Sequence, residues 1–154
     1  MELSELKRKE GIVQNEKLES AYAQLDKLLN ELKKKELSEE TEISINQKID
    51  QINTFSESEK DLKKMIAKTQ SSILNLLEKE HKIVAKNHYR NIWMSVGMAA
   101  FGIPLGVVFG TSLGNMAFLS IGLPIGMVIG MVVGSGMDKK ASEEGRQIDL
   151  EINY

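Results

Sequence analysis

Hydrophobic and polar residues are segregated along this chain into a polar first part, an apolar block and a short polar tail. Residues 1–90 mix apolar and charged side chains, residues 91–137 contain no charged side chain at all, and residues 138–154 are polar again. A soluble helical hairpin would need surrounding protein to cover the 47 residues of the block, and the rest of the chain is too polar to do so. The block therefore predicts helices that cross a lipid bilayer.

The length of the apolar block predicts two membrane spans. As one helix the block would extend about 70 Å, whereas the hydrocarbon core of a bilayer is about 30 Å thick. Two helices of about 20 residues joined by a short turn use up this length. We expect spans at Ile92–Ser112 and Met116–Met137, with the turn at Leu113-Gly114-Asn115.

Charged and aromatic residues at the ends of the block predict its orientation. Basic residues precede the first span and follow the second, whereas the turn has no charge, so the positive-inside rule places both termini in the cytoplasm. The start of the chain has no apolar stretch and predicts no signal peptide. We therefore expect a multi-pass protein of the inner (cytoplasmic) membrane. Its expected interface anchors are Tyr89, Arg90, Trp93, Lys139 and Lys140.

An internal repeat with an offset of 20 residues runs through the apolar block. The segment from Gly102 to Gly110 (GIPLGVVFG) matches the segment from Gly122 to Gly130 (GLPIGMVIG). Glycines four residues apart lie nearly in line along a helix, and the groove they form lets helix backbones pack closely in lipid. The two grooves can meet within one hairpin, where Gly106 would lie at the level of Gly122, or each can meet another subunit. The predicted packing residues are Gly102, Gly106, Gly110, Gly114, Gly122, Gly126, Gly130 and Gly134.

Each span also has one proline at the same place in the repeat, Pro104 in the first and Pro124 in the second. A proline inside a helix removes one backbone hydrogen bond, so we expect a kink in each span. Proline is also tolerated in membrane helices without any gating role. The kinks are thus open to two interpretations, a gate hinge or a purely structural feature.

The polar first part of the chain predicts a helical arm. Apolar residues follow the alternating four- and three-residue spacing of a coiled-coil seam, first from Leu18 to Leu32 and again from Leu62 to Ile83. We expect helices at about 4–35, 39–54 and 57–90, the last one continuous with the first span because no glycine or proline interrupts it. The arm would fold back as a hairpin or bundle, or pair between subunits.

Short polar signals mark where the helices should begin and end. Ser38 is expected to start the second helix, and Ser56 with Glu59 has the spacing of a capping box at the start of the third. Gly145 is expected to stop the helix of the second span. After it, apolar and polar residues alternate over 147–154, which is the pattern of a strand. A lone strand is unstable, so this tail either pairs with another strand or, as we expect, stays disordered.

Charge and motif content exclude several functions. The arm has 17 basic and 17 acidic residues, so it offers no net basic attraction for nucleic acid. The chain has no cysteine, which excludes disulfides and zinc–thiolate sites. Glu78 and His81 have the Glu-x-x-His spacing of a di-iron site, but such a site needs two of these motifs and two further carboxylates, so we expect a solvated helix face. The sequence thus predicts no catalytic residue, no metal site, no cofactor and no enzymatic activity.

Residues 87–152 resemble the C-terminal region of small, uncharacterised bacterial two-pass glycine-zipper membrane proteins. The resemblance rests on the stretch from NHYRNIWMSVG through the repeated Gly-x-Pro-x-Gly core to SGMDKKASEEGRQIDLEI. It implies an anchor that packs on itself, and it implies no catalytic residue and no ligand.

These patterns together predict an all-α membrane protein with a cytoplasmic arm at residues 1–90, a transmembrane hairpin at residues 91–137 and a short cytoplasmic tail at residues 138–154. We expect an anchor and scaffold that forms homo-oligomers through its glycine-zipper helices and presents the arm to a cytoplasmic protein partner. The alternative is a homo-oligomeric pore or gated membrane effector, with the Gly-Pro elements as its constriction. An ion path usually contains an ionisable residue within the membrane, and this block has none, so the anchor is the preferred hypothesis.

Overall fold

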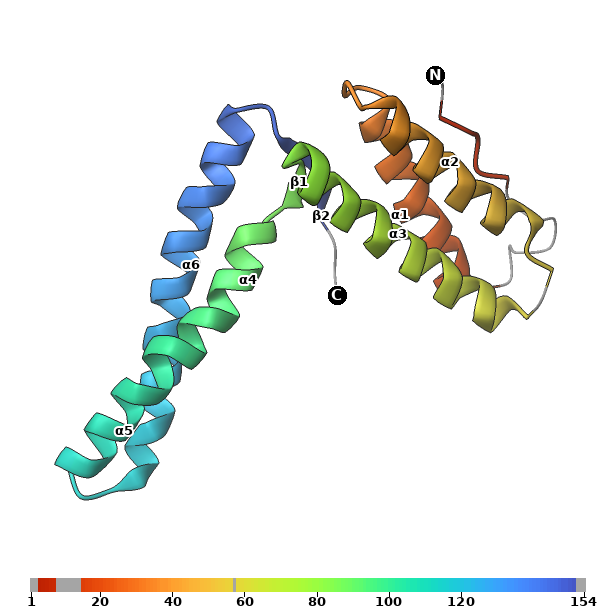
Figure 1. Cartoon of the computed structure of the whole chain (residues 1–154). Helices are drawn as coiled ribbons and strands as arrows, with labels where there is room; N and C mark the ends of the chain where they lie inside the picture. The colour runs from red at the N-terminus through yellow and green to blue at the C-terminus, as the bar shows by residue number, and fades with distance from the viewer. Residues whose placement is uncertain (1–2, 8–14, 57, 152–154) are drawn as a thin grey trace. The chain divides into compact units, whose positions relative to one another are not determined.

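The computed structural model of the chain describes residues 3–7, 15–56 and 58–151 (Figure 1). They fall into two compact units, one containing the arm and the strand that follows Gln147, the other containing residues 85–147. In chain order the elements are α1 (Glu16–Leu32), α2 (Glu39–Thr54), α3 (Glu59–His81), β1 (Val84–Lys86), α4 (His88–Gly97), the π-helix η2 (Met98–Gly102), α5 (Ile103–Ser112), the 3-10 helix η3 (Met116–Phe118), α6 (Leu119–Glu143) and β2 (Gln147–Glu151). The chain is mostly helical, as predicted, but β1 and β2 form a two-stranded sheet that was not expected.

The three arm helices each begin at a polar capping residue. Asn15, Ser38 and Ser58 accept hydrogen bonds from backbone N–H groups in the first turns of α1, α2 and α3. The N-cap of α3 is therefore Ser58, which bonds Asp61 three residues later, and our placement of the helix start at Ser56 with Glu59 was wrong by two residues. The Ser58 hydroxyl donates to the Asp61 carboxylate at 2.6 Å, and this bond lowers the pKa of Asp61.

The arm helices form a bundle in which α3 packs against both α1 and α2 (Figure 1). The predicted apolar positions of α1 are all buried, and so are those of α3 as far as Ile73. After Ile73 the buried residue is Leu77, whereas the seam that we predicted passes through Leu76 and the exposed Glu80. A straight α-helix has 3.6 residues per turn and drifts away from a strict seven-residue pattern, which accounts for the shift.

The N-terminal segment 3–7 is not helical, although we expected a helix from residue 4. The side-chain carbonyl of Asn46 accepts from the Ser4 N–H at 2.7 Å, and that of Asn53 accepts from the Lys7 N–H at 2.8 Å. The Asn53 amide also donates to the Glu5 carbonyl at 3.0 Å. These bonds to α2 take the place of backbone bonds that a helix would make. Residues 8–14, the rest of that expected helix before Asn15, lie outside the described residues.

The expected continuous helix from the arm into the apolar block is interrupted. Helix α3 ends at His81, and Lys82 and Asn87 adopt left-handed backbone conformations, with φ of 55° and 60°. Between them, Ile83 and Val84 are buried and the chain forms strand β1. We predicted continuity because glycine and proline are absent, but asparagine and, less often, other residues can also adopt this conformation.

The tail strand β2 is the partner of β1, so the expectation of a disordered tail was wrong for residues 147–151. Its alternating pattern is reflected in the burial of Ile148 and Leu150, whereas Asp149 and Glu151 are exposed. Gly145, with φ of 69°, follows the end of α6, as predicted. Residues 152–154 lie outside the described part of the chain.

The packing of the arm helices can be tested by substituting one buried and one exposed residue. The Leu25 side chain is fully buried, whereas Ile43 is 39% exposed. Leu25→Ala should cost about 2–5 kcal/mol, because it removes buried methyl groups and leaves a cavity. Ile43→Ala should cost less than about 1 kcal/mol, because its side chain already contacts water. Hydrogen exchange of the α1–α3 amides measures both variants, and equal loss of protection would contradict the bundle.

Candidate functional site

The main contact of the second unit is a line of glycines, here called the glycine seam. It joins the helix run α4–η2–α5 to α6, which lie side by side in Figure 1. All its members are buried: Gly97, Gly102, Gly106 and Gly110 on the first run, and Gly122, Gly126, Gly130 and Gly134 on α6.

Backbones touch directly along the glycine seam. A methyl group added to Gly126 would lie 2.5 Å from the backbone nitrogen and 2.6 Å from the Cα of Gly102. One added to Gly106 would lie 2.6 Å from the Leu119 carbonyl oxygen. Real side chains do not come so close to backbone, so alanine fits at neither position without moving the helices apart. Gly106 and Gly102 lie opposite Gly122 and Gly126, which is the register predicted for grooves that meet within one hairpin.

The seam includes Gly97, which the sequence analysis missed, and leaves out Gly114. Gly97 lies five residues before Gly102, so it does not fit a four-residue spacing. The π-helix η2 occupies this interval, and its wider turn brings both glycines to the same face. Gly114 lies in the loop between the helices with φ of 67°, and a methyl group there would meet no atom within 4 Å.

The two prolines occupy different local structures despite their equivalent places in the repeat. Pro104 is at the start of α5, directly after η2, whose closing bond runs from the Ile103 N–H to the Met98 carbonyl. Pro104 cannot donate a hydrogen bond to the carbonyl four residues earlier, which favours a change of helix type at this place. Pro124 lies inside α6, which continues through it.

Asp138 closes the end of the hairpin opposite the turn. Its carboxylate accepts from the Tyr89 N–H at 3.1 Å and from the Arg90 N–H at 2.9 Å. These are N–H groups of the first turn of α4, which no residue within that helix satisfies. Asp138 is 7% exposed and lies four residues after Gly134, so the α6 row of the seam ends in a carboxylate that caps the other helix. The four-residue spacing could have revealed this role from the sequence.

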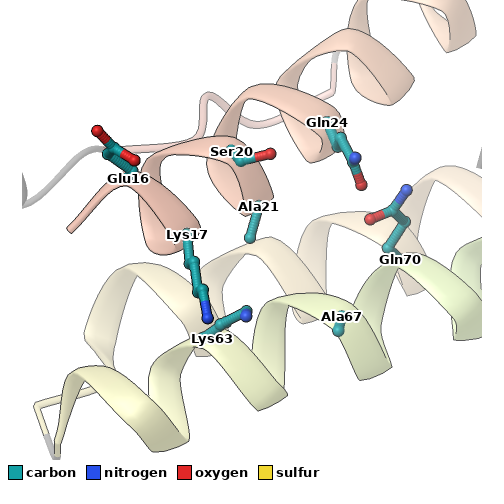
Figure 2. Close-up of a pocket in the computed structure, with 8 residues that line it drawn as sticks. All are labelled: Glu16, Lys17, Ser20, Ala21, Gln24, Lys63, Ala67 and Gln70. Carbon is teal, nitrogen blue, oxygen red and sulfur yellow. The ribbon is translucent and has the colours of Figure 1, made fainter. Parts of the chain in front are cut away.

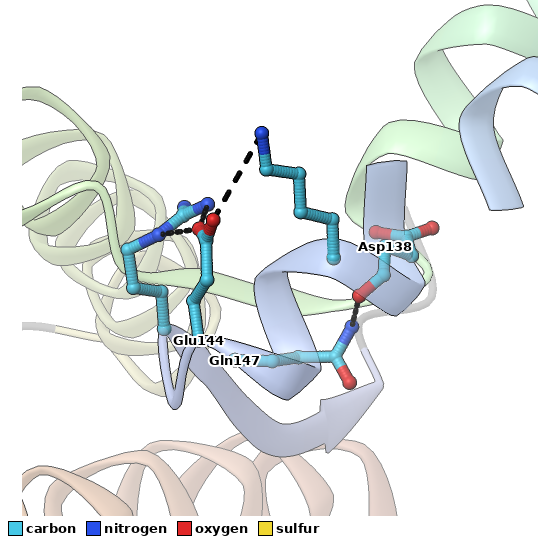
Figure 3. A network of polar contacts seen from close by, with 5 residues as sticks. Asp138, Glu144 and Gln147 are labelled. Atoms are coloured by element: carbon cyan, nitrogen blue, oxygen red, sulfur yellow. Dashed lines mark hydrogen bonds and ion pairs between the residues drawn. The ribbon is translucent and has the colours of Figure 1, made fainter. Parts of the chain in front are cut away.

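The predicted interface anchors gather at this same end of the hairpin. Lys139 pairs with Glu143 at 3.8 Å, and Lys140 pairs with Glu144 at 3.9 Å. A hydrogen bond from Arg146 lowers the pKa of Glu144. Figure 3 shows Glu144 near the bond from the Gln147 amide to the Asp138 carbonyl. The backbones of the other three anchors, Tyr89, Arg90 and Trp93, lie against Gly134 or Gly130.

His81, which the sequence analysis considered as part of a metal-binding motif, contacts the start of α2. Its Nε2 lies 3.0 Å from the Thr41 hydroxyl and 3.5 Å from the Ser38 hydroxyl, at the start of α2. Among residues 3–7, 15–56 and 58–151, no group of three or more His, Cys, Asp or Glu side chains could hold a metal ion.

The outer surface of the hairpin is apolar. Two described helices, His88–Ser112 and Met116–Glu143, are long and apolar enough to cross a membrane. Only 17% of the most apolar stretch of each helix is buried. Exposed large apolar residues occur along both, for example Phe101, Val108 and Val132, which are 47%, 56% and 69% exposed.

No protein-family model, curated protein or solved structure matches this chain. The resemblance to bacterial glycine-zipper proteins therefore stays a prediction.

The seam can be tested by comparing two glycines of α6. Gly126→Ala should destabilise the hairpin by about 1–3 kcal/mol, because the added methyl group overlaps backbone atoms of Gly102. A methyl group at Gly136 would meet no atom within 4 Å, so Gly136→Ala should be neutral or stabilise α6 by up to about 1 kcal/mol. Unfolding of detergent-solubilised protein by added dodecyl sulfate, followed through the fluorescence of its single tryptophan, measures both. If the two variants were equally stable, the glycines would not form the contact.

The cap can be tested at Asp138. Asp138→Ala should cost about 0.5–2 kcal/mol, because two N–H groups lose their acceptor. Asp138→Asn keeps one acceptor oxygen and should cost less. Hydrogen exchange at the Tyr89 and Arg90 amides should accelerate in the alanine variant and less in the asparagine variant. Unchanged exchange in Asp138→Ala would show that the carboxylate does not protect these groups.

Proposed function

We propose that this protein is an integral membrane anchor that holds a helical arm at the cytoplasmic face of the inner membrane and presents it to a protein partner. The observation that carries the proposal is the exposed apolar surface of the two long helices of the hairpin. A helix in the core of a soluble protein hides such a surface against other elements, and a single-chain hairpin with its apolar side chains directed outward matches lipid as its solvent.

The contacts inside the hairpin support the same proposal. In lipid there is no hydrophobic force between helices, so packing depends on close approach and on hydrogen bonds between helices. The seam supplies the close approach, and Asp138 supplies hydrogen bonds at one end. The basic residues at that end, together with an uncharged turn at residues 113–115, favour an orientation with both termini in the cytoplasm.

The seam glycines of the two helices already face one another within one chain. Self-association through these glycines and a pore built from several hairpins therefore remain predictions with weaker support. A pore also needs polar groups along a water path. The hydroxyl groups of Ser95, Thr111 and Ser120 instead donate to backbone carbonyls of nearby residues, three or four positions earlier. This arrangement supports the anchor over the pore.

The proposed topology can be tested with single cysteines, because the chain has none of its own. Cysteine is placed at Ser4, Asn115 or Ser142, and intact cells are treated with a thiol reagent that does not cross the membrane. We expect labelling at position 115 alone, and labelling at all three positions after permeabilisation. Labelling at positions 4 and 142 with protection at 115 would reverse the orientation. Release of the protein from membranes by alkaline carbonate would reject the anchor itself.

A further inference from the structure

Extended segments lie against the helices of the arm in two places. The segment Ser4–Lys7 is held on α2 by the Asn46 and Asn53 amides, which bond only its backbone atoms. Strand β2 lies against α1, where the backbone N–H of Asp149 donates to the Glu31 carboxylate. The bundle thus binds extended chain through side-chain amides and carboxylates directed at backbone groups.

A third surface of this kind, which we call the α1/α3 groove, is open. It has a volume of about 540 Å³ and lies between the first halves of α1 and α3 (Figure 2). The two helices supply the same three residue types at the same spacing. α1 contributes Lys17, Ala21 and Gln24, and α3 contributes Lys63, Ala67 and Gln70.

In the groove each helix has an alanine where it has a leucine seven residues later. Seven residues after Ala21 and Ala67, the same helix positions are occupied by Leu28 and Leu74, and the Leu28 side chain is fully buried. Side chains seven residues apart share a face, so the larger Leu28 occupies space in the row that Ala21 leaves open, and Leu74, which is half-buried, does so in part.

One polar group of the groove is buried without a partner. Gln70 is 6% exposed, and its side-chain nitrogen has no hydrogen-bond partner. A buried donor without an acceptor is costly, so a ligand that supplies one gains affinity. Figure 2 shows the Lys17 and Lys63 side chains converging at one end of the groove, with Glu16 directed away from them. Among the described residues, no ion pair to either lysine is found.

We propose that the α1/α3 groove binds an extended acidic segment of a partner protein. A carboxylate of the segment lies between the two lysine ammonium groups, and its backbone passes over the alanines to the Gln24 and Gln70 amides. Seven helical residues rise about 10 Å, which an extended peptide covers in about three residues. The amides bond peptide groups, as Asn46 and Asn53 do for the segment at Ser4. This inference rests on the proposed function, since it names the kind of partner that the arm is presented to.

The probe is fluorescein-labelled, N-acetylated tetraglutamate, titrated with the full chain in nanodiscs of zwitterionic lipid and followed by fluorescence anisotropy. We expect saturable binding of this peptide and none of the matching tetraglutamine. Lys17→Glu combined with Lys63→Glu should weaken binding at least about tenfold, because attraction becomes repulsion. Ala67→Leu should weaken it similarly by filling the groove, without any change of charge.

The matched control is Lys68→Glu, on an exposed residue of α3 outside the groove, which should change affinity less than about twofold. The inference is overturned if tetraglutamate does not bind, if tetraglutamine binds equally well, if Lys68→Glu weakens binding as much as the double variant, or if Ala67→Leu leaves affinity unchanged. Carbonate extraction of the same protein tests the anchor separately. Retention in the membrane without peptide binding would reject this inference alone, whereas release would reject the proposed function.

Discussion

The structure of the hairpin depends on direct contact between two helix backbones. At Gly126 and Gly106 no other residue permits this contact, because a Cβ there would overlap backbone atoms of the other helix. The contact also dictates the remaining features of the hairpin. The first helix must keep its glycines on one face, which η2 achieves between Gly97 and Gly102, and the chain must turn sharply enough to bring the helices together, which Gly114 permits.

This close contact also brings the N-terminus of α4 next to α6, where Asp138 of α6 caps it. Because the backbones lie so near each other, a short aspartate side chain reaches two N–H groups of the facing helix. The carboxylate is favoured there by the positive end of the helix dipole. Packing and capping therefore reinforce each other, since moving the helices apart for a larger residue at Gly134 would also remove the acceptor from Tyr89 and Arg90. The glycines along the hairpin and the aspartate at its end thus stabilise the same helix contact.

Sequence reasoning found the features that depend on composition and regular spacing. The two apolar helices, the turn between Ser112 and Met116 and the facing of Gly106 with Gly122 all follow from length and from a repeat of four residues. It failed where a residue departs from the regular helix. The π-helix changes the period locally, so Gly97 was missed, and the left-handed conformation of Lys82 ends α3 without glycine or proline. The partner of β2 was also missed, since Ile83 and Val84 were counted as part of a helix that continues into the first span.

The arm contains as many basic as acidic residues over positions 1–90, and this balance limits how it can recognise a partner. Long-range attraction is weak for a neutral surface, and exposed ion pairs such as Lys64 with Asp61 contribute little. Specific binding must then come from a local site, where charged side chains of the same sign lie beside a groove that a ligand can enter. The α1/α3 groove has this character, because alanines open the space, lysines of both helices lie at one end, and the buried Gln70 amide lacks an acceptor. In the proposed anchor, such a groove would let the arm select a partner by shape and by a single carboxylate, without attracting acidic surfaces in general.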